Sequence, residues 1–290
     1  MNNPLFRPPA EAESLILQVD QGCPYNRCTF CGMYRGVRHH RRPVDEVRTL
    51  IVQESGRHPE AQRVFLADGD VMRRPFDQLQ AILTMLHEHL PRLSRVSLYA
   101  NGSSIAAKSA QQLRDLRALK LHTLYMGLES GDEDILRRCH KGATAAQMVE
   151  AAIAAQSAGL RMSVMILLGL GGSDHTGEHV THTAAALNRM QPRLLSALRV
   201  IPVEGTELHE DVGSGRFRQL TEYQVIQELR DIIDGLNLTG TVFRANHSSN
   251  VLPLEARLPR DKERLLGELD ALLASGDLDE RTPGPMPLWL

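Results

Sequence analysis

The sequence lacks long apolar segments, has only four cysteines and carries almost no net charge. A transmembrane helix needs about 20 consecutive apolar residues, and no run in this chain approaches that length. The first residues also lack the apolar core of a secretory signal peptide. We therefore expect a cytoplasmic protein with no membrane partner. In that compartment disulfides are rare, and clustered cysteines bind metal or take part in redox chemistry.

The net charge and the length of the chain limit its possible partners and its number of domains. The formal net charge of -2 at pH 7 excludes a general electrostatic attraction to nucleic acid or anionic membranes. With 290 residues, of which 42% are hydrophobic, the chain can bury the core of one large domain, with or without a small appendage. It contains no internal repeat and no low-complexity linker.

Short apolar segments alternate with longer amphipathic ones over most of the chain. The expected strands are Ser14–Val19, Arg63–Ala67, Arg95–Ala100, His122–Gly127, Arg161–Leu168 and Ala197–Val203. The expected helices between them are Val44–Ser55, Phe76–His89, Ser109–Ala118, Ala145–Ala158 and His179–Met190. This alternation predicts βαβ units in a parallel sheet, either open or curled into a partial barrel. In such folds the functional residues lie in loops at the carboxyl ends of the strands.

The pattern loosens after Val203. One more strand is expected at Thr241–Ala245, followed by an amphipathic helix from about residue 259 to 274. The Pro-rich tail over residues 283–290 is expected to be irregular.

Three of the four cysteines lie within nine residues, directly after the first expected strand. Cys23, Cys28 and Cys31 can hold an iron–sulfur cluster that leaves one iron open to an outside ligand. Alternatively, His39 or His40 completes a Cys₃His zinc site, since structural zinc favours four closed ligands. A zinc finger would form a small autonomous unit, whereas this loop opens an enzyme-sized α/β domain, which favours the cluster.

This loop resembles the cluster motif of the radical S-adenosylmethionine (radical SAM) superfamily, in which an aromatic residue precedes the last cysteine. Phe30 takes that place. The usual motif has three and then two residues between its cysteines, whereas this chain has the variant C-x4-C-x2-C. Cys23 and Cys28 are thus separated by one extra residue.

The resemblance implies an α/β fold, namely a partial (β/α)6 TIM-like barrel of parallel strands with a short C-terminal extension. We expect the barrel over residues 14–210, after an N-terminal arm over residues 1–13. The extension over residues 211–290 is expected to pack on the barrel and line its substrate side.

Further motifs of the superfamily follow in the expected order, each after an expected strand. Asp68, Gly69 and Asp70 resemble the segment that receives the methionyl amine of S-adenosylmethionine, where a small turn exposes backbone carbonyls and a carboxylate. A helix-capping turn is the alternative interpretation. Asn101 and Ser103 follow the third strand and offer polar contacts to the cofactor, although a plain turn also accounts for them.

The segment Gly-Leu-Glu-Ser-Gly at residues 127–131 resembles the branch that contains the Elp3-like, methylthiotransferase (MiaB) and NifB-like enzymes. In that branch the glutamate lies in the cofactor site, and a basic residue about twelve positions later reaches the cofactor carboxylate. Glu129 and Lys141 occupy those places. Gly169 ends the fifth expected strand, in a segment that resembles the motif packing against adenine; a buried strand that ends in a glycine turn has the same pattern.

The resemblance implies a [4Fe–4S] cluster on the three loop cysteines and S-adenosylmethionine on its fourth iron. Reductive cleavage would give a 5′-deoxyadenosyl radical that abstracts hydrogen from a substrate. A low-potential electron donor such as flavodoxin or ferredoxin is then a partner. Only Cys139 remains, so a second cysteine-ligated cluster is not expected, which disfavours typical methylthiotransferases. No cobalamin domain is expected before the barrel. A zinc-binding module and a cluster-carrying electron-transfer protein are the alternatives.

The sequence patterns that indicate substrate-contacting residues are weaker than those for the cofactors. A basic run follows the cysteine loop and is either a solvated face or the lining of an entrance for an anionic substrate, such as a carboxylate, a phosphate or RNA; it comprises Arg35, Arg38, His39, His40, Arg41 and Arg42. Asn246 and His247 lie in a polar cluster after the last expected strand and are candidate substrate contacts. Arg199 is a third candidate if its strand register points it inward. We expect a small-molecule or presented side-chain substrate, and nothing in the net charge supports nucleic acid.

Overall fold

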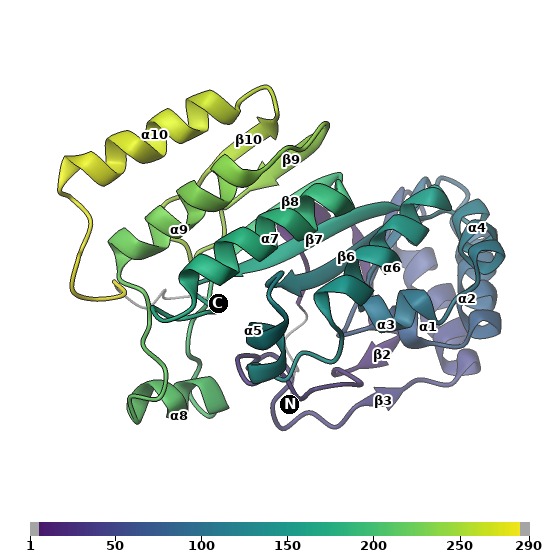
Figure 1. The fold of residues 1–290 in the computed structure, drawn as a ribbon. Coiled ribbons are helices and arrows are strands. Elements are labelled where there is room, and N and C mark those ends of the chain that lie inside the picture. Colours follow the sequence, from purple (N-terminus) through teal and green to yellow (C-terminus); the bar gives the residue numbers. More distant parts are fainter. Residues whose placement is uncertain (1–5, 285–290) are drawn as a thin grey trace. The chain divides into compact units, whose positions relative to one another are not determined.

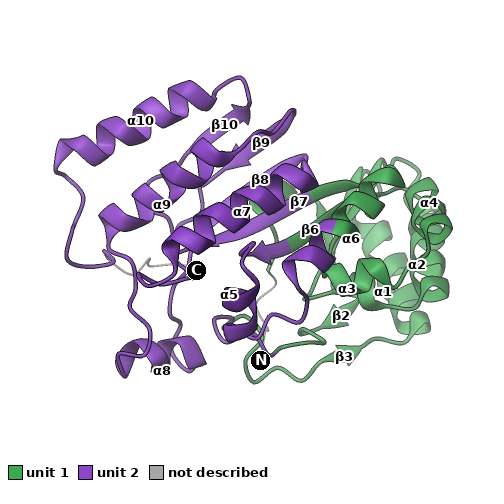
Figure 2. Cartoon of the chain, viewed as in Figure 1, with its two compact units in different colours: residues 1–26, 33–126, 150–162 green, residues 27–32, 127–149, 163–290 purple. Residues whose placement is uncertain are grey.

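The structure is a computed structural model that describes residues 6–284. Residues 1–5 of the expected arm and residues 285–290 of the expected irregular tail lie outside the described part. The chain divides into two compact units, coloured separately in Figure 2. Unit 1 contains residues 1–26, 33–126 and 150–162, and unit 2 contains residues 27–32, 127–149 and 163–290. Between residues 6 and 284, no helix is both long and apolar enough to cross a membrane.

Eight strands form one sheet in the order β1-β4-β5-β6-β7-β8-β9-β10. The pairs from β1 to β6 and from β7 to β9 are parallel, and β10 is antiparallel to β9. These strands are β1 (Leu15–Leu17), β4 (Arg63–Leu66), β5 (Arg95–Tyr99), β6 (Leu121–Glu129), β7 (Arg161–Leu168), β8 (Leu194–Arg199), β9 (Thr241–Arg244) and β10 (Glu255–Leu258). The predicted α/β fold with a partial barrel of parallel strands is confirmed. A separate antiparallel pair joins β2 (Asp20–Gln21) to β3 (His40–Arg41).

The helices follow the strands, as expected for βαβ units. In unit 1, α1 packs on α2 and α2 on α4, while in unit 2 α9 packs between α7 and α10 (Figure 1). The α-helices are α1 (Val44–Arg57), α2 (Phe76–His89), α3 (Gly102–Ala106), α4 (Ala110–Ala118), α5 (Glu133–Arg138), α6 (Ala145–Ser157), α7 (Thr176–Met190), α8 (Glu207–Gly213), α9 (Glu222–Gly235) and α10 (Lys262–Ser275). Two short 3₁₀ turns are η1 (Pro9–Glu11) and η2 (Val71–Arg73).

The expected elements before Val203 all form, although several of their boundaries differ, and β8 differs most. β8 begins at Leu194, three residues earlier than expected, because Leu194 and Leu195 already pair with Ser163 and Val164 of β7. It ends at Arg199, before Pro202, whose nitrogen has no proton to donate to a ladder.

Local sequence explains where several helices begin. Ser109 and Gln112 form a reciprocal capping box at the start of α4, and Thr221 and Gln224 form one at the start of α9. Asp132 caps α5 by accepting the Ile135 amide over 2.9 Å. These caps fix the points at which the chain leaves the loops that follow the strands.

Candidate active site

In unit 1, the first cysteine lies against the loop that follows β4. The Gly69 amide donates to the Gly22 carbonyl over 3.2 Å. A Cβ atom added at Gly69 would lie 2.6 Å from both Cα and Cβ of Cys23, which is closer than real Cβ contacts allow. The Asn26 amide donates to Cys23 Sγ over 3.4 Å. The glycine that the sequence singled out is therefore needed for close approach of the two loops.

In unit 2, the second half of the cysteine loop is anchored by backbone hydrogen bonds. The Thr29 amide donates to the Cys139 carbonyl over 3.0 Å, and the Thr29 carbonyl accepts from Leu208 over 3.1 Å. Phe30 packs against a buried apolar cluster, which consists of Ile135, Cys139, Leu170, Val200 and Leu208. The expected cofactor-side aromatic thus also holds the loop.

Asp68 and Asp70 have different environments, although both carboxylates are buried in unit 1. Asp68 has a left-handed backbone with φ of 85° and accepts the Gln18 side-chain amide over 2.7 Å, with the Tyr34 hydroxyl beside it. Burial raises the pKa of Asp68 despite these two donors. A strained backbone at a non-glycine residue is typical of functional sites.

Asp70 instead ties two loops of unit 1 together. Its carboxylate accepts the Ser104 hydroxyl over 2.7 Å and the Asn101 amide over 3.2 Å. Burial raises its pKa, while these two bonds oppose the shift. The Asn101 side chain accepts the Ser103 amide and caps α3. These hydrogen bonds bring Asp70, Asn101 and Ser103 together at the start of α3.

Glu129 and Lys141 form a buried ion pair in unit 2. Lys141 Nζ donates to Glu129 Oε1 over 2.9 Å, and the two side chains are 10% and 11% exposed. Burial lowers the pKa of Lys141, but the negative charges of Glu129 and Cys28 outweigh it and raise that pKa. Glu129 has a left-handed φ of 64°. Gly127 is required beside the pair, because a Cβ atom there would collide with the Glu129 carboxylate.

Gly169, at the end of β7, is held by a buried carboxylate that the sequence analysis did not single out. The Gly169 amide donates to Glu228 Oε1 of α9 over 2.6 Å, and the Thr176 hydroxyl donates to Glu228 Oε2 over 2.5 Å. His179 Nε2 lies 3.7 Å from Glu228 Oε1, and its Nδ1 is 2.8 Å from the Ser130 hydroxyl. Through His179 and Glu228, this network links Ser130, which follows Glu129, to Gly169 at the end of β7.

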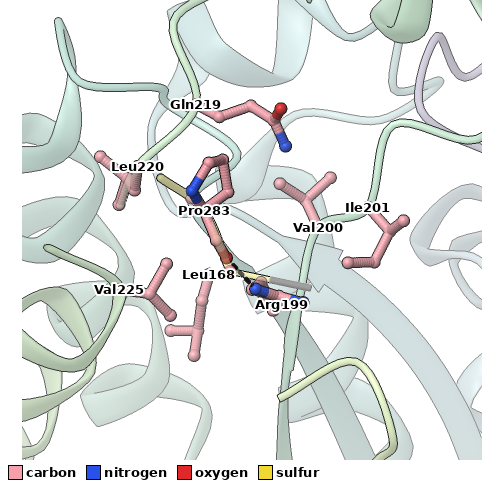
Figure 3. Close-up of a pocket in the computed structure, with 10 residues that line it drawn as sticks. Leu168, Arg199, Val200, Ile201, Gln219, Leu220, Val225 and Pro283 are labelled. Carbon is pink, nitrogen blue, oxygen red and sulfur yellow. Dashed lines mark hydrogen bonds between the residues drawn. The ribbon is translucent and has the colours of Figure 1, made fainter. Parts of the chain in front are cut away.

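The substrate-side candidates have other partners in unit 2. Figure 3 shows the Arg199 guanidinium directed to the Pro283 carbonyl, on the wall of a cavity of about 20 Å³ that Leu168 and Val225 also line. Arg199 belongs to the same buried face of β8 as Leu195 and Ala197.

His247 is engaged within its own loop, and Asn246 is exposed. A ring nitrogen of His247 accepts the Ser249 amide over 3.1 Å and lies 2.9 Å from the Ser249 hydroxyl. Burial lowers the pKa of His247. Asn250, from the same polar cluster, bonds the β8 backbone on both sides of Leu198: its side chain accepts the Arg199 amide and donates to the Ala197 carbonyl.

A cavity of about 300 Å³ lies in unit 2 beside Thr29 of the cysteine loop. Its apolar wall includes Ile135, Leu170 and Phe217, and its polar wall includes three arginines and two aspartates. Two of the arginines are ion-paired, Arg216 with Asp211 and Arg218 with Asp174. No local sequence pattern predicts this cavity, because its lining residues come from five separate segments.

The three loop cysteines are divided between the units, with Cys23 in unit 1 and Cys28 and Cys31 in unit 2. Among residues 6–284, no group of three or more His, Cys, Asp or Glu side chains lies close enough together to hold a metal ion. The donor chemistry fits an iron–sulfur cluster: three thiolates leave one iron open. The Lys141 ammonium near Cys28 would also stabilise the anionic charge of cluster sulfurs.

The parallel sheet, the cysteine loop after β1 and the buried charges at strand ends are typical of α/β enzymes, whose functional residues lie at the carboxyl ends of parallel strands. The sequence model of the radical SAM superfamily matches residues 17–184, more than half of the chain. The protein belongs to the radical SAM superfamily. It is therefore an enzyme whose cofactors are a [4Fe–4S] cluster and S-adenosylmethionine, which decides against the zinc-module and electron-transfer alternatives.

Solved structures share the fold at low sequence identity. Methylornithine synthase (PylB) is 17% identical with a TM-score of 0.54, and the match covers 89% of this chain and 81% of that one. Coproporphyrinogen III oxidase (HemN) from Escherichia coli is 15% identical with a TM-score of 0.56, covering 76% and 51%. Elp3 from Methanocaldococcus infernus is 16% identical with a TM-score of 0.51, covering 93% and 65%. No curated protein sequence matches the chain.

Proposed function

We propose that this protein uses Cys23, Cys28 and Cys31 to hold the cluster, and that it abstracts hydrogen from a small molecule or a presented side chain. When bound, the cluster and S-adenosylmethionine supply a 5′-deoxyadenosyl radical through one-electron cleavage of the sulfonium. The observation that carries the proposal is the buried Glu129–Lys141 pair, whose ammonium lies within electrostatic reach of Cys28.

The residues around the cofactor divide into two groups in this proposal. The backbone at Asp68 and Gly69 receives the methionyl ammonium, and the Asp68 carboxylate adds an attractive charge. Glu129 and Lys141 bind the ribose and carboxylate end, and Gly169 and Phe30 pack against adenine. Asp70, Asn101 and Ser103 position this site through the hydrogen bonds that join their loops.

The remaining expectations stay part of the proposal. Asn246 and His247 are its substrate-side candidates. Arg199 is the third candidate, and its guanidinium donates to the Pro283 carbonyl. We further propose a cytoplasmic protein with a barrel over residues 14–210, an extension over residues 211–290 and a flavodoxin or ferredoxin as reductant.

Anaerobic reconstitution tests the proposal. We expect a brown protein with about four irons and four sulfides per chain, which forms 5′-deoxyadenosine from S-adenosylmethionine under titanium(III) citrate. The Cys28→Ser variant should lose both cluster and product, whereas Cys139→Ser should keep both. A colourless protein with one zinc per chain would contradict the proposal, and so would a cluster-loaded protein that forms no deoxyadenosine.

A further inference from the structure

The basic run that follows the cysteine loop folds back onto the strand that leads into it. In unit 1, β3 pairs with β2 in antiparallel register, so that Arg41 lies opposite Asp20 and His40 opposite Gln21. Cys23 follows Gln21 after a single glycine. A solvated face could lie anywhere on the molecule, but this pairing places the basic run beside the first cluster cysteine.

Positive charges from two other segments of unit 1 approach the same strand. Burial lowers the pKa of His39, and the charges of Arg41, Arg73 and His40 lower it further, against an opposing effect of Asp20. Arg41 also lowers the pKa of Lys108, after burial and against Asp70. Lys108, which follows α3, donates from Nζ to the Met72 carbonyl of η2 over 3.0 Å, so it lies beside the segment that carries Arg73. We call the cationic side chains of these segments the basic face: Arg38, Arg41, Arg73 and Lys108.

Two carboxylates that act on this part of unit 1, Asp20 and Asp70, are buried and already bound. Asp20 accepts two hydrogen bonds from the fully buried Arg74, at 3.1 and 2.7 Å. Asp70 is bound by Ser104 and Asn101. In the part of the chain that the structure describes, neither Arg41 nor Arg73 forms an ion pair. These two arginines are therefore available to pair with an acidic partner.

An exposed apolar side chain lies between the cysteine loop and the basic run. Met33 is 39% exposed and follows Cys31 by two residues. Met is enriched in the centres of protein interfaces, whose rims are polar, and redox complexes form small, weak interfaces of this kind. Tyr34 is the one phenylalanine, tyrosine or tryptophan within residues 33–42, and it is buried, so this described run offers no such ring for stacking on bases. These features favour an acidic protein over RNA.

We propose that the basic face docks an acidic, low-potential electron-donor protein beside Cys23. This inference rests on the proposed function, because it supplies that function with its reductant. One electron leaves the reduced donor and enters the oxidised cluster; no bond is made or broken in that transfer. Because the net charge of the chain is -2, the protein as a whole does not attract anions. The positive charge of the basic face acts only on a donor close to it, and we expect it to orient that donor.

The test measures binding of purified flavodoxin to the reconstituted enzyme by titration calorimetry at low salt. We expect the Arg41→Glu/Arg73→Glu variant to bind at least about tenfold more weakly than wild type, and about 0.5 M salt to abolish the difference by screening. Arg114→Glu, on the exposed side of α4 in the same unit, is the matched control and should bind as wild type. Arg38→Glu, at an exposed position two residues before β3, gives a second variant if the double one unfolds.

Chemical reduction separates this inference from the proposed function. With titanium(III) citrate the charge-reversed and wild-type enzymes should form 5′-deoxyadenosine equally, since a small reductant needs no docking face. Loss of product in both enzymes would overturn the proposed function, whatever flavodoxin does. Unchanged flavodoxin affinity in both variants would overturn the docking surface, as would tighter binding of a single-stranded RNA oligonucleotide than of flavodoxin.

Discussion

Gly69 is the residue at which the loop after β4 comes nearest to the first cysteine. A methyl group there would lie 2.6 Å from Cys23 Cβ, and part of the neighbour is backbone, which cannot move away as a flexible side chain would. We expect Gly69→Ala to lower the free energy of unfolding by about 1–3 kcal/mol, as overpacking does. The iron content after reconstitution should fall as well, because Cys23 is displaced.

Gly56 provides the control for that substitution. It lies within α1, and a Cβ atom there meets nothing within 4 Å. Gly56→Ala should raise stability by about 0.5–1 kcal/mol through helix propensity and leave the iron content unchanged. Urea unfolding and iron analysis of both variants check the prediction. Equal iron content in Gly69→Ala and wild type would refute it.

Cys139 is buried, whereas the three loop cysteines are partly exposed. Burial raises its pKa to about 12, with a further contribution from the negative charge of Cys28. A raised pKa keeps the thiol neutral at pH 8, and a neutral thiol is a poor nucleophile. In the protein without cluster, iodoacetamide should therefore modify the half-exposed loop cysteines at pH 8 and leave Cys139 unmodified. Peptide mass mapping measures this, with the urea-unfolded chain as the fully labelled control. Rapid native-state labelling of Cys139 would argue against its burial.

At the scale of elements, the predictable parts of the fold are those with strong periodicity. β7 was predicted at its observed bounds because its apolar run is bounded by turn residues, and α2 because its apolar residues recur at helical spacing. α9 was not predicted, although its Thr221 and Gln224 form a readable capping box. β10 has only four residues of ordinary composition, and its pairing with β9 is a tertiary contact that no local pattern encodes.

The same limit applies to the site. Glu129 and Lys141 could be found because a sequence motif carries them. Glu228 lies in α9, 59 residues from the Gly169 amide that it binds, and a glutamate in a helix has the sequence pattern of a solvated side chain. Only the fold shows that its carboxylate is buried and bound.

Glu228 leads to a prediction about how α9 supports the end of β7. Glu228→Ala would leave the Gly169 amide and the Thr176 hydroxyl without their acceptor, at about 1–3 kcal/mol for each buried group. Glu228→Gln keeps an acceptor for one of them and should recover part of that loss. If Gly169 contacts the cofactor, both variants should raise KM for S-adenosylmethionine more than they lower kcat.

Two measurements check the role of α9. Urea unfolding gives the stability change, and steady-state kinetics under titanium(III) citrate separate KM from kcat. Gln227→Ala, in the same helix, is the control, because its side chain bonds only Asp231 within α9. A fall in kcat with unchanged KM would assign Glu228 a purely structural role.

At the scale of the whole molecule, the expected boundary at residue 210 falls inside unit 2, which continues from residue 163 to the C-terminus. β9 pairs with β8 in parallel register, and α9 packs on α7. Several residues of α9 are fully or almost fully buried, among them Leu229, Ile232 and Ile233. Removing residues 211–290 would expose the apolar surface that they cover, at roughly 1.5–3 kcal/mol for each large side chain.

We therefore expect a chain of residues 1–210 to lose cooperative folding, even though it contains the whole segment matched by the superfamily model. Several buried side chains at about 1.5–3 kcal/mol each amount to a loss comparable with the 5–15 kcal/mol that stabilises a typical domain. Thermal unfolding followed by near-ultraviolet circular dichroism should show a single transition for the full chain and none for the truncated one. A truncated chain that melts cooperatively and reconstitutes its cluster would instead make residue 210 a true domain boundary, and α9 an accessory to a self-sufficient barrel.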